Sequence, residues 1–167
     1  MNWNVLHVRP RCEKKMAEYC TLHQIPTYLP LRQEPKVYQR RKVIVSKPLF
    51  PGYVFADFPP SERLLVQESR KLVRCLEVPD QVGFANELEQ VRKALLVDAT
   101  LGATPELVTG QPVRIISGPF QGLEGVVSSV QGMTRVVLNV DMIGQSVRVE
   151  AEPHMLEPRE PPAPRPS

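Results

Sequence analysis

The side chains best suited to acid–base or metal chemistry are few and widely spaced in this sequence. They are His7, His23, His154, Cys12, Cys20 and Cys75. No spacing among them matches a nucleophile–base pair, a zinc-ligand motif or a CxxC pair. The turn at 118–122 also lacks the Lys-Ser/Thr that a phosphate-binding loop needs. We therefore expect no catalytic residues, no metal and no cofactor, and we interpret the cysteines as reduced core residues.

The composition is that of a globular protein, with 42% apolar residues in a chain of 167, enough for one ordinary domain or two small ones. No apolar run reaches the roughly 18 residues that a membrane span needs. The N-terminus lacks the basic segment and apolar core of a secretory signal. We therefore expect a cytoplasmic protein without a membrane partner.

Positive charge is concentrated in the first third of the chain. Residues 1–58 contain ten Lys/Arg against four Asp/Glu, whereas the remainder is slightly acidic. Val37-Tyr38 and the β-branched run at 43–45 predict the arms of a hairpin with a basic tip. Its cations suit phosphates and its tyrosine suits base stacking. The predicted nucleic-acid-binding residues are Arg32, Lys36, Tyr38, Arg40, Arg41, Lys42 and Lys47. A solvated basic face is the alternative.

Aromatic side chains follow a rigid turn in the segment at 48–58, which contains Pro51 and Gly52. Tyr53 and Phe55 alternate with Val54 and Ala56, so the two pairs point to opposite faces of one strand. We expect a cover on only one face, which leaves the two aromatic side chains as an anchor for a protein partner. The alternative is that both fill the core.

Periodicity elsewhere in residues 1–98 predicts an α+β domain, an antiparallel sheet flanked by helices. Asn86 and Glu89 have the spacing of a capping box, which predicts that the last helix of this domain begins near Asn86. The other expected elements are strands at 3–8, 27–29 and 72–78, a helix at 11–23 and a short helix at 59–69.

The second half of the chain changes character. Residues 99–107 are small and polar and are expected to form an interdomain linker. Between 108 and 157, short β-branched runs alternate with glycine-containing turns, which predicts a small SH3-like β-barrel. Residues 158–167 contain five prolines and are expected to form a disordered or polyproline extension.

Two of these segments resemble the NusG family of bacterial transcription factors. The first comprises WNVLHV at 3–8, the helix that follows and PLFPGYVFADF at 48–58, and it is similar to the N-terminal (NGN) domain of that family. The second is GQPVRIISGPFQGLEGVV at 110–127, which is similar to the KOW motif. Ribosomal proteins also carry KOW motifs, but both segments in this order are typical of NusG proteins.

That resemblance implies a transcription elongation or antitermination factor, which we expect to act as a monomer. Its N-terminal domain would bind the clamp helices of RNA polymerase through an aromatic-lined depression, and the hairpin would lie near upstream or non-template DNA. The matching positions for the polymerase are His7, Phe50, Pro51, Tyr53 and Phe55. The barrel would recruit a small-subunit ribosomal protein or the termination factor Rho through Phe120, Met142 and Ile143.

Two departures from the housekeeping pattern bring the chain closer to the specialised RfaH and UpxY paralogues. The hairpin tip reads YQRRK at 38–42 in place of a glycine-containing turn, and Met142-Ile143 stands where housekeeping members carry an Ile-Phe pair. These departures favour an operon-restricted antiterminator. A housekeeping NusG and an RNA- or ribosome-binding KOW protein are the alternatives.

The RfaH resemblance also raises the possibility that the C-terminal domain rests as a helical hairpin. Residues 112–150 contain five glycines, each unfavourable in a helix by about 1 kcal/mol relative to Ala, and the segments between them are rich in Val and Ile. We therefore predict a persistent barrel that leaves Tyr53 and Phe55 open to the polymerase.

Overall fold

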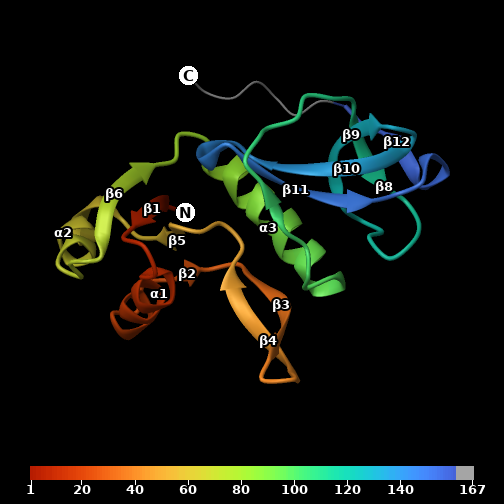
Figure 1. The fold of residues 1–167 in the computed structure, drawn as a ribbon. Coiled ribbons are helices and arrows are strands. Elements are labelled where there is room, and N and C mark those ends of the chain that lie inside the picture. Colours follow the sequence, from red (N-terminus) through yellow and green to blue (C-terminus); the bar gives the residue numbers. More distant parts are fainter. Residues whose placement is uncertain (161–167) are drawn as a thin grey trace.

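The computed structural model describes residues 1–160. An α+β domain and an all-β domain lie on either side of helix α3 (Gln81–Val97), as Figure 1 shows. The predicted fold class is therefore confirmed. Residues 161–167 of the expected tail lie outside the described part of the chain. Its first residues are paired, because Pro158 ends strand β12 (Leu156–Pro158) and Arg159 lies 3.2 Å from the carboxylate of Glu124.

The N-terminal domain is built on a four-stranded antiparallel sheet in the order β2-β5-β1-β6. Its central strand β1 is nearly all apolar and is buried from Asn4 to Leu6. The other elements of this domain are α1 (Glu13–Leu22), β2 (Thr27–Tyr28), β5 (Tyr53–Asp57), η1 (Pro60–Glu62), α2 (Arg63–Gln67) and β6 (Leu72–Glu77), with β1 spanning Trp3–Val8.

Helices cover both faces of this sheet. Phe55 on one face packs in an apolar cluster with Phe84 of α3. Val54 on the opposite face packs with Met16 and Cys20 of α1 in a second cluster. Because successive strand residues point to opposite faces, neighbouring residues of β5 are buried in different clusters. The sheet is thus the middle of three layers.

Helix α3 begins at Gln81, well before the start near Asn86 that the capping-box spacing predicts. Asp80 is the N-cap residue, and its Oδ1 accepts a hydrogen bond from the N–H of Gly83 at 2.9 Å. Phe84 is fully buried and fixes the first turn to the sheet. The predicted start is therefore wrong, because Asp80 already satisfies a free N–H group of the helix.

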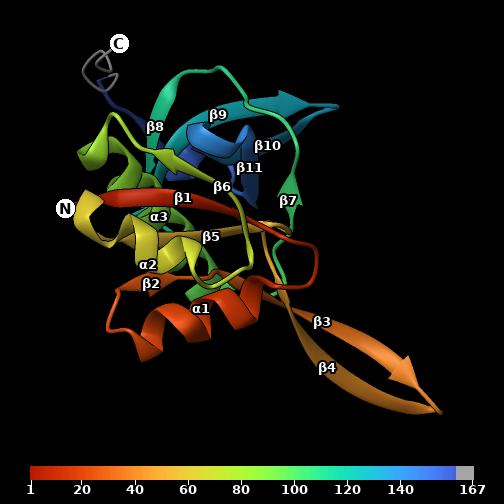
Figure 2. The ribbon, with the colours of Figure 1, turned by 90° about the vertical axis from the view of Figure 1, so that its left-hand side faces the viewer.

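A separate two-stranded hairpin extends away from the N-terminal domain, as Figure 2 shows. It consists of β3 (Leu31–Tyr38) and β4 (Arg41–Pro48), so the predicted hairpin is confirmed. Gln39 and Arg40 form its tip with φ angles of 48° and 64°. Two consecutive left-handed residues are the geometry of a type I′ turn, whose twist matches that of the strands.

The C-terminal domain is a six-stranded antiparallel sheet in the order β12-β8-β9-β10-β11-β7. Residues 112–150 form strands and short turns, which confirms the predicted absence of a helical hairpin. Gly125 is required by packing, since a Cβ there would lie 2.5 Å from the carbonyl oxygen of Val137. The remaining bounds are β7 (Ala103–Thr104), β8 (Pro112–Ile115), β9 (Glu124–Val130), β10 (Met133–Val140), η2 (Asp141–Ile143), β11 (Gln145–Glu150) and η3 (Pro153–Met155).

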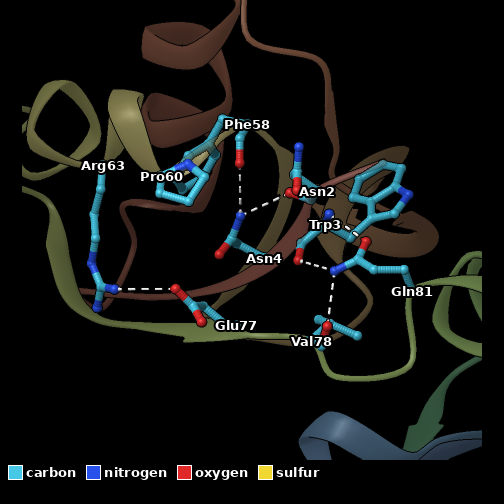
Figure 3. A pocket seen from close by; sticks show the side chains of 9 residues that line it. All are labelled: Asn2, Trp3, Asn4, Phe58, Pro60, Arg63, Glu77, Val78 and Gln81. Carbon is cyan, nitrogen blue, oxygen red and sulfur yellow. Dashed lines mark hydrogen bonds and ion pairs between the residues drawn. The ribbon is translucent and has the colours of Figure 1, made fainter.

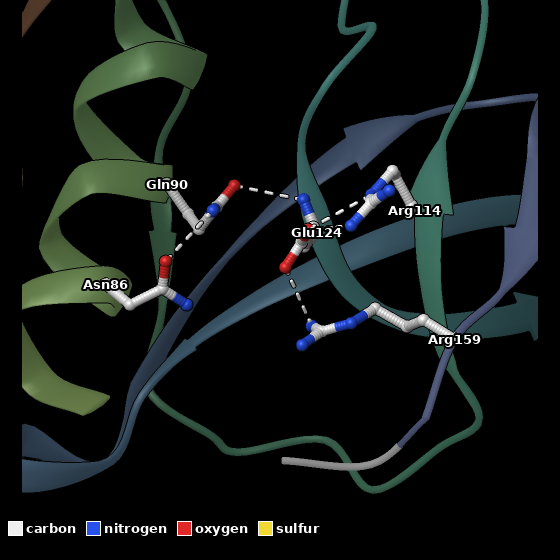
Figure 4. Close-up of polar contacts among 5 residues, drawn as sticks. All are labelled: Asn86, Gln90, Arg114, Glu124 and Arg159. Carbon is white, nitrogen blue, oxygen red and sulfur yellow. Dashed lines mark hydrogen bonds and ion pairs between the residues drawn. The ribbon is translucent and has the colours of Figure 1, made fainter. Parts of the chain in front are cut away.

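The two domains meet along α3 through polar contacts (Figure 4). Gln90, only 6% exposed, accepts a hydrogen bond from the N–H of Glu124 at 3.0 Å. The carboxylate of Glu124 lies 2.8 Å from Arg114 and 3.2 Å from Arg159. The hydrogen bond to Gln90 holds the first residue of β9 against the helix, and the charge-assisted pairs fix the Glu124 side chain to Arg114 and Arg159 of its own domain.

The segment expected as a linker is tied down at both ends. Arg32 of β3 donates to the carbonyl oxygens of Thr100 at 2.9 Å and Leu101 at 3.1 Å. Ala103 and Thr104 form β7, which pairs with β11. The C-terminal sheet therefore extends from β7 to β12, beyond the expected limits of 108 and 157 on both sides.

Candidate functional site

A stacked pair of rings marks the candidate binding surface of the N-terminal domain. The register of β1 and β5 places His7 directly opposite Tyr53. Their ring centroids are 5.2 Å apart with an interplanar angle of 23°, and both side chains are partly exposed. Gly52 has a φ of 89°, a conformation that favours glycine, and its α-carbon passes close to the imidazole of His7. The two rings therefore rest beside a glycine turn, where a Cβ on Gly52 would lie 3.6 Å from Cδ2 of His7.

A mainly apolar groove of about 650 Å³ lies beside this pair, between the end of β1, the start of α1 and the base of the hairpin. Glu13 is buried in it, and its Oε2 accepts a hydrogen bond from the N–H of Gly52 at 3.2 Å. Arg11 and Lys14 leave positive charge at the rim. The lining residues are His7, Val8, Pro10, Arg11, Glu13, Lys14, Ser46, Pro48, Pro51, Gly52 and Val73.

The five positions matched to the polymerase divide into two groups. His7, Pro51 and Tyr53 reach the surface, whereas Phe50 is 1% exposed and Phe55 is 0% exposed. The rings of both phenylalanines meet edge to face, with centroids 6.2 Å apart. The expectation that only one face of β5 is covered is therefore wrong. Helix α3 covers the face that carries Phe55, and α1 covers the other.

The hairpin cations also divide into two groups. At the base, Glu34 lies 2.8 Å from Lys47 and 3.7 Å from Arg32, whose guanidinium also holds the linker. The hydrogen bond from Lys47 lowers the pKa of the Glu34 carboxyl. At the distal half, the exposed side chains are Lys36, Tyr38, Arg40, Arg41 and Lys42. This distal group combines exposed cations with an exposed ring, which suits a polyanion.

The three positions matched to a partner of the C-terminal domain lie in different surroundings. Phe120 lines a surface hollow of about 500 Å³ together with Met133 and Met155. Met142 and Ile143 are not among the residues that line it. They lie on the η2 turn, where the N–H of Asp141 donates to Oε2 of Glu87 on α3 at 3.2 Å. That turn is therefore part of the contact between the domains.

A polar hollow of about 240 Å³ at the N-terminal end of β1 is held together by internal hydrogen bonds (Figure 3). The amide of Asn4 donates to the carbonyl oxygen of Asn2 at 2.8 Å, and that of Gln81 donates to Trp3 at 2.9 Å. Arg63 and Glu77 form an ion pair at 3.6 Å. These side chains join β1 to its neighbours, so their role here is structural.

The cysteines lie where a structural role predicts. Cys20 is fully buried, and burial raises the pKa of its thiol to about 11. A neutral thiol is a poor nucleophile and a poor metal ligand. Within residues 1–160, no three His, Cys, Asp or Glu side chains come close enough together to hold a metal ion. None of the helices in this range combines the length and apolar character needed to cross a bilayer.

Sequence reasoning missed several residues of the groove. Glu13 is only 7% exposed, because it binds the backbone of a turn 39 residues away. Ser46 and Pro48 at the hairpin base also line the groove. The alternation of β1 could have placed His7 there, but a long-range contact such as that of Glu13 leaves no local pattern.

Fold and surface together define a two-domain α+β binding protein, with a grooved aromatic surface on one domain and a small all-β domain behind it. A family model described as "Transcription termination factor nusG" matches residues 1–99. The chain belongs to the NusG family.

Relatives and solved structures agree with this assignment. The proteins named "Transcription termination/antitermination protein NusG" from Staphylococcus aureus strains N315 and MW2 are each 29% identical to this chain, over 90% of it and 87% of the relative. The solved structure "Domain interaction in Thermotoga maritima NusG" is 21% identical, with a TM-score of 0.50 over 95% of this chain and 97% of that one. At that identity the likeness shows the fold alone.

Proposed function

We propose that this protein is a transcription elongation and antitermination factor that binds the clamp helices of bacterial RNA polymerase through the groove beside His7 and Tyr53. The stacked pair is the observation that carries the proposal. Two rings held at the surface, next to an apolar groove and a glycine turn, form a preorganised anchor for a protein partner. Phe50 and Phe55 take part from beneath, because they fix the strand that carries Tyr53.

The distal hairpin is the proposed nucleic-acid contact. Its exposed cations and Tyr38 extend away from the body of the domain, and so reach beyond the groove toward upstream or non-template DNA. The cations at the base are engaged with Glu34 and the linker. We therefore assign direct contact with DNA to the distal group and a supporting role to Arg32 and Lys47.

The proposed cellular role is that of a specialised, operon-restricted paralogue. The glycine-free tip and the Met142-Ile143 turn are the residues that support it. A housekeeping role, coupling the polymerase to a ribosomal protein or to Rho through Phe120, Met142 and Ile143, is the alternative. In either role we expect a cytoplasmic monomer with no catalytic activity of its own.

Polymerase binding is tested by truncating the exposed ring. Tyr53→Ala should weaken binding to core RNA polymerase by about 30-fold, because a hot-spot truncation costs about 2 kcal/mol. Leu64→Ala, which removes a 65% exposed side chain on α2, is the control and should bind normally. Affinity is measured by titrating the polymerase into labelled protein, with circular dichroism to verify the fold. Normal binding by a folded Tyr53→Ala variant would contradict the assignment.

The nucleic-acid contact is tested by a triple change, Arg40→Ala with Arg41→Ala and Lys42→Ala. It should weaken association with a complete elongation complex but spare binding to isolated clamp helices. The difference should shrink as salt rises, because the lost contacts are to phosphates. The matched control removes Lys15, Arg63 and Lys93, which are exposed elsewhere on the domain. Equal losses in both assays would mean that the hairpin contacts protein and not DNA.

A further inference from the structure

The strand register gives the β3–β4 hairpin two chemically different faces. Side chains directly opposite each other share a face, as do alternate residues along each strand. Pro35 lies directly opposite Ile44, and Val37 lies directly opposite Lys42, so these four side chains share one face of the hairpin. We call the three apolar residues among them, Pro35, Val37 and Ile44, the apolar face. The opposite, charged face carries Arg32, Glu34, Lys36, Tyr38, Arg41, Val43, Val45 and Lys47.

Contacts between side chains confirm this division. Glu34 reaches Lys47 and Arg32 on the charged face, and Gln33 donates to Ser46 at 3.0 Å on the other. The apolar face is left open to solvent, because the hairpin is a separate two-stranded sheet. Val37 is 73% exposed and Ile44 is 70% exposed. Adjacent β-branched side chains with this exposure favour burial against another surface.

The apolar face continues into the groove at the base of the hairpin. Ser46 and Pro48 follow Ile44 on the same face of β4, and both line the groove with His7 and Pro51. Lys14 donates to the carbonyl oxygen of Ser46 at 2.8 Å, which joins α1 to this surface. One uninterrupted surface therefore runs from the stacked rings to the distal part of the hairpin.

Charge beside this surface indicates the chemistry of its occupant. Arg11 and Lys14 border the groove, and Lys42 shares the face of the hairpin that carries Pro35, Val37 and Ile44, directly opposite Val37. Lys36, Arg41 and Tyr38, the groups suited to phosphates and bases, point to the opposite side of the hairpin. A nucleic acid bound there would leave the apolar face uncovered.

We infer that the apolar face, Pro35, Val37 and Ile44, is a second polymerase-binding surface, which docks on an apolar, acid-bordered protein patch next to the element held in the groove. The hairpin thus lies between polymerase on its apolar face and nucleic acid on its charged face. This inference rests on the proposed function, since continuity with the proposed groove identifies the occupant. It adds a contact that neither the sequence motifs nor the stacked rings indicate.

The test is a pair of double variants that keep β-branched residues in the strands. Val37→Thr with Ile44→Thr changes the apolar face, and Val43→Thr with Val45→Thr changes the charged face as a matched control. Binding of labelled full-length protein to core RNA polymerase without nucleic acid is measured beside the wild type and Tyr53→Ala. We expect the apolar-face variant to bind about tenfold more weakly and the control to bind like the wild type.

Each other outcome overturns the inference in a recognisable way. If the wild type binds, Tyr53→Ala does not, and the apolar-face variant binds like the wild type, then this inference fails while the proposed function stands. If the wild type itself fails to bind, both fail. A loss seen only with a nucleic-acid scaffold would make DNA the occupant. A wild-type dimer in sedimentation that the apolar-face variant abolishes would make a second copy the occupant.

Discussion

The β3–β4 and β9–β10 hairpins are similar in length and in the way they turn. Both have two-residue tips with positive φ angles, Gln39-Arg40 in the first and Gln131-Gly132 in the second. Their surroundings differ. Val136 and Val137 of β10 are fully buried, and β9 and β10 each have a second neighbouring strand. Among residues 1–160 no further strand pairs with the β3–β4 hairpin, and its apolar face is exposed.

The difference shows which parts of a hairpin the fold requires. A two-stranded hairpin is marginally stable alone, so β3–β4 depends on contacts at its base, where Glu34 meets Lys47 and Arg32 holds the linker. Its distal apolar side chains contribute nothing to a core. The β9–β10 hairpin instead depends on its side chains throughout the barrel core. The fold does not need the exposed apolar residues of the β3–β4 hairpin. Their presence therefore indicates a role in binding.

The largest expected effect separates the two hairpins by stability. Leu138→Ala, at 2% exposure in β10, should lower the free energy of unfolding by about 2–5 kcal/mol through lost burial and the cavity left behind. Ile44→Ala, at 70% exposure in β4, should change it by less than about 0.5 kcal/mol. Urea denaturation followed by circular dichroism measures both. Similar losses would show that the β3–β4 hairpin is part of the cooperative core.

A smaller effect on stability is expected at the tips of the two hairpins, where one substitution should destabilise its hairpin and another should stabilise the other. Gly132 has a φ of 77°, so Gly132→Ala should destabilise the β9–β10 turn by about 1 kcal/mol. Arg40 has a φ of 64°, and glycine is the preferred residue at this position of a type I′ turn, so Arg40→Gly should stabilise its hairpin. Hydrogen exchange of the flanking strand amides measures each change. Faster exchange around Arg40→Gly would contradict the assigned turn.

The smallest expected effect is a dependence on pH at the base of β3–β4. The bond from Lys47 lowers the pKa of Glu34 below its ordinary value of 4.5. Because the pKa is lowered by folding, the Glu34–Lys47 pair stabilises the hairpin fully at a pH above 4.5. This stabilisation is lost as the pH falls through the lowered pKa of the folded protein. Residues 129–134, the distal part of β9–β10, contain no acidic side chain, so their amides should not respond. Amide NMR shifts against pH test this, and Glu34→Gln should remove the dependence.

Local patterns in the sequence account for the elements that depend on neighbouring residues. Alternation and turn residues place β1, the β3–β4 hairpin and the strands of the C-terminal domain, and the glycines exclude helices there. The start of α3 was misplaced because two N-terminal signals compete. Asn86 and Glu89 have capping-box spacing, but Asp80 caps the helix and buried Phe84 selects that start. Tertiary packing decides between such local alternatives.

The candidate site was predictable only in part for the same reason. Tyr53 follows from strand alternation and the PGY turn, and His7 from the resemblance to the NusG family. Phe55 is buried by α3, a helix that begins more than 25 residues later in the chain. Strand alternation cannot show that a helix covers the second face of the sheet. The groove depends on Glu13 reaching Gly52, and the tie between Arg32 and the linker spans 68 residues. Contacts of this range have no signature in one sequence.

The anchored linker also sets how far the C-terminal domain can move. Between the end of α3 and the start of β7 lie only residues 98–102, which span at most about 17 Å when extended. A molecule carried by the C-terminal domain is therefore kept at a high effective concentration beside the groove. Beyond β7 the chain is held again, because Ser146 donates to the carbonyl oxygen of Glu106 at 2.7 Å and Asn139 makes two hydrogen bonds with the backbone of Val108. The tether lengthens to roughly 50 Å, up to β8 at residue 112, only when these contacts and the β7–β11 pairing are all broken.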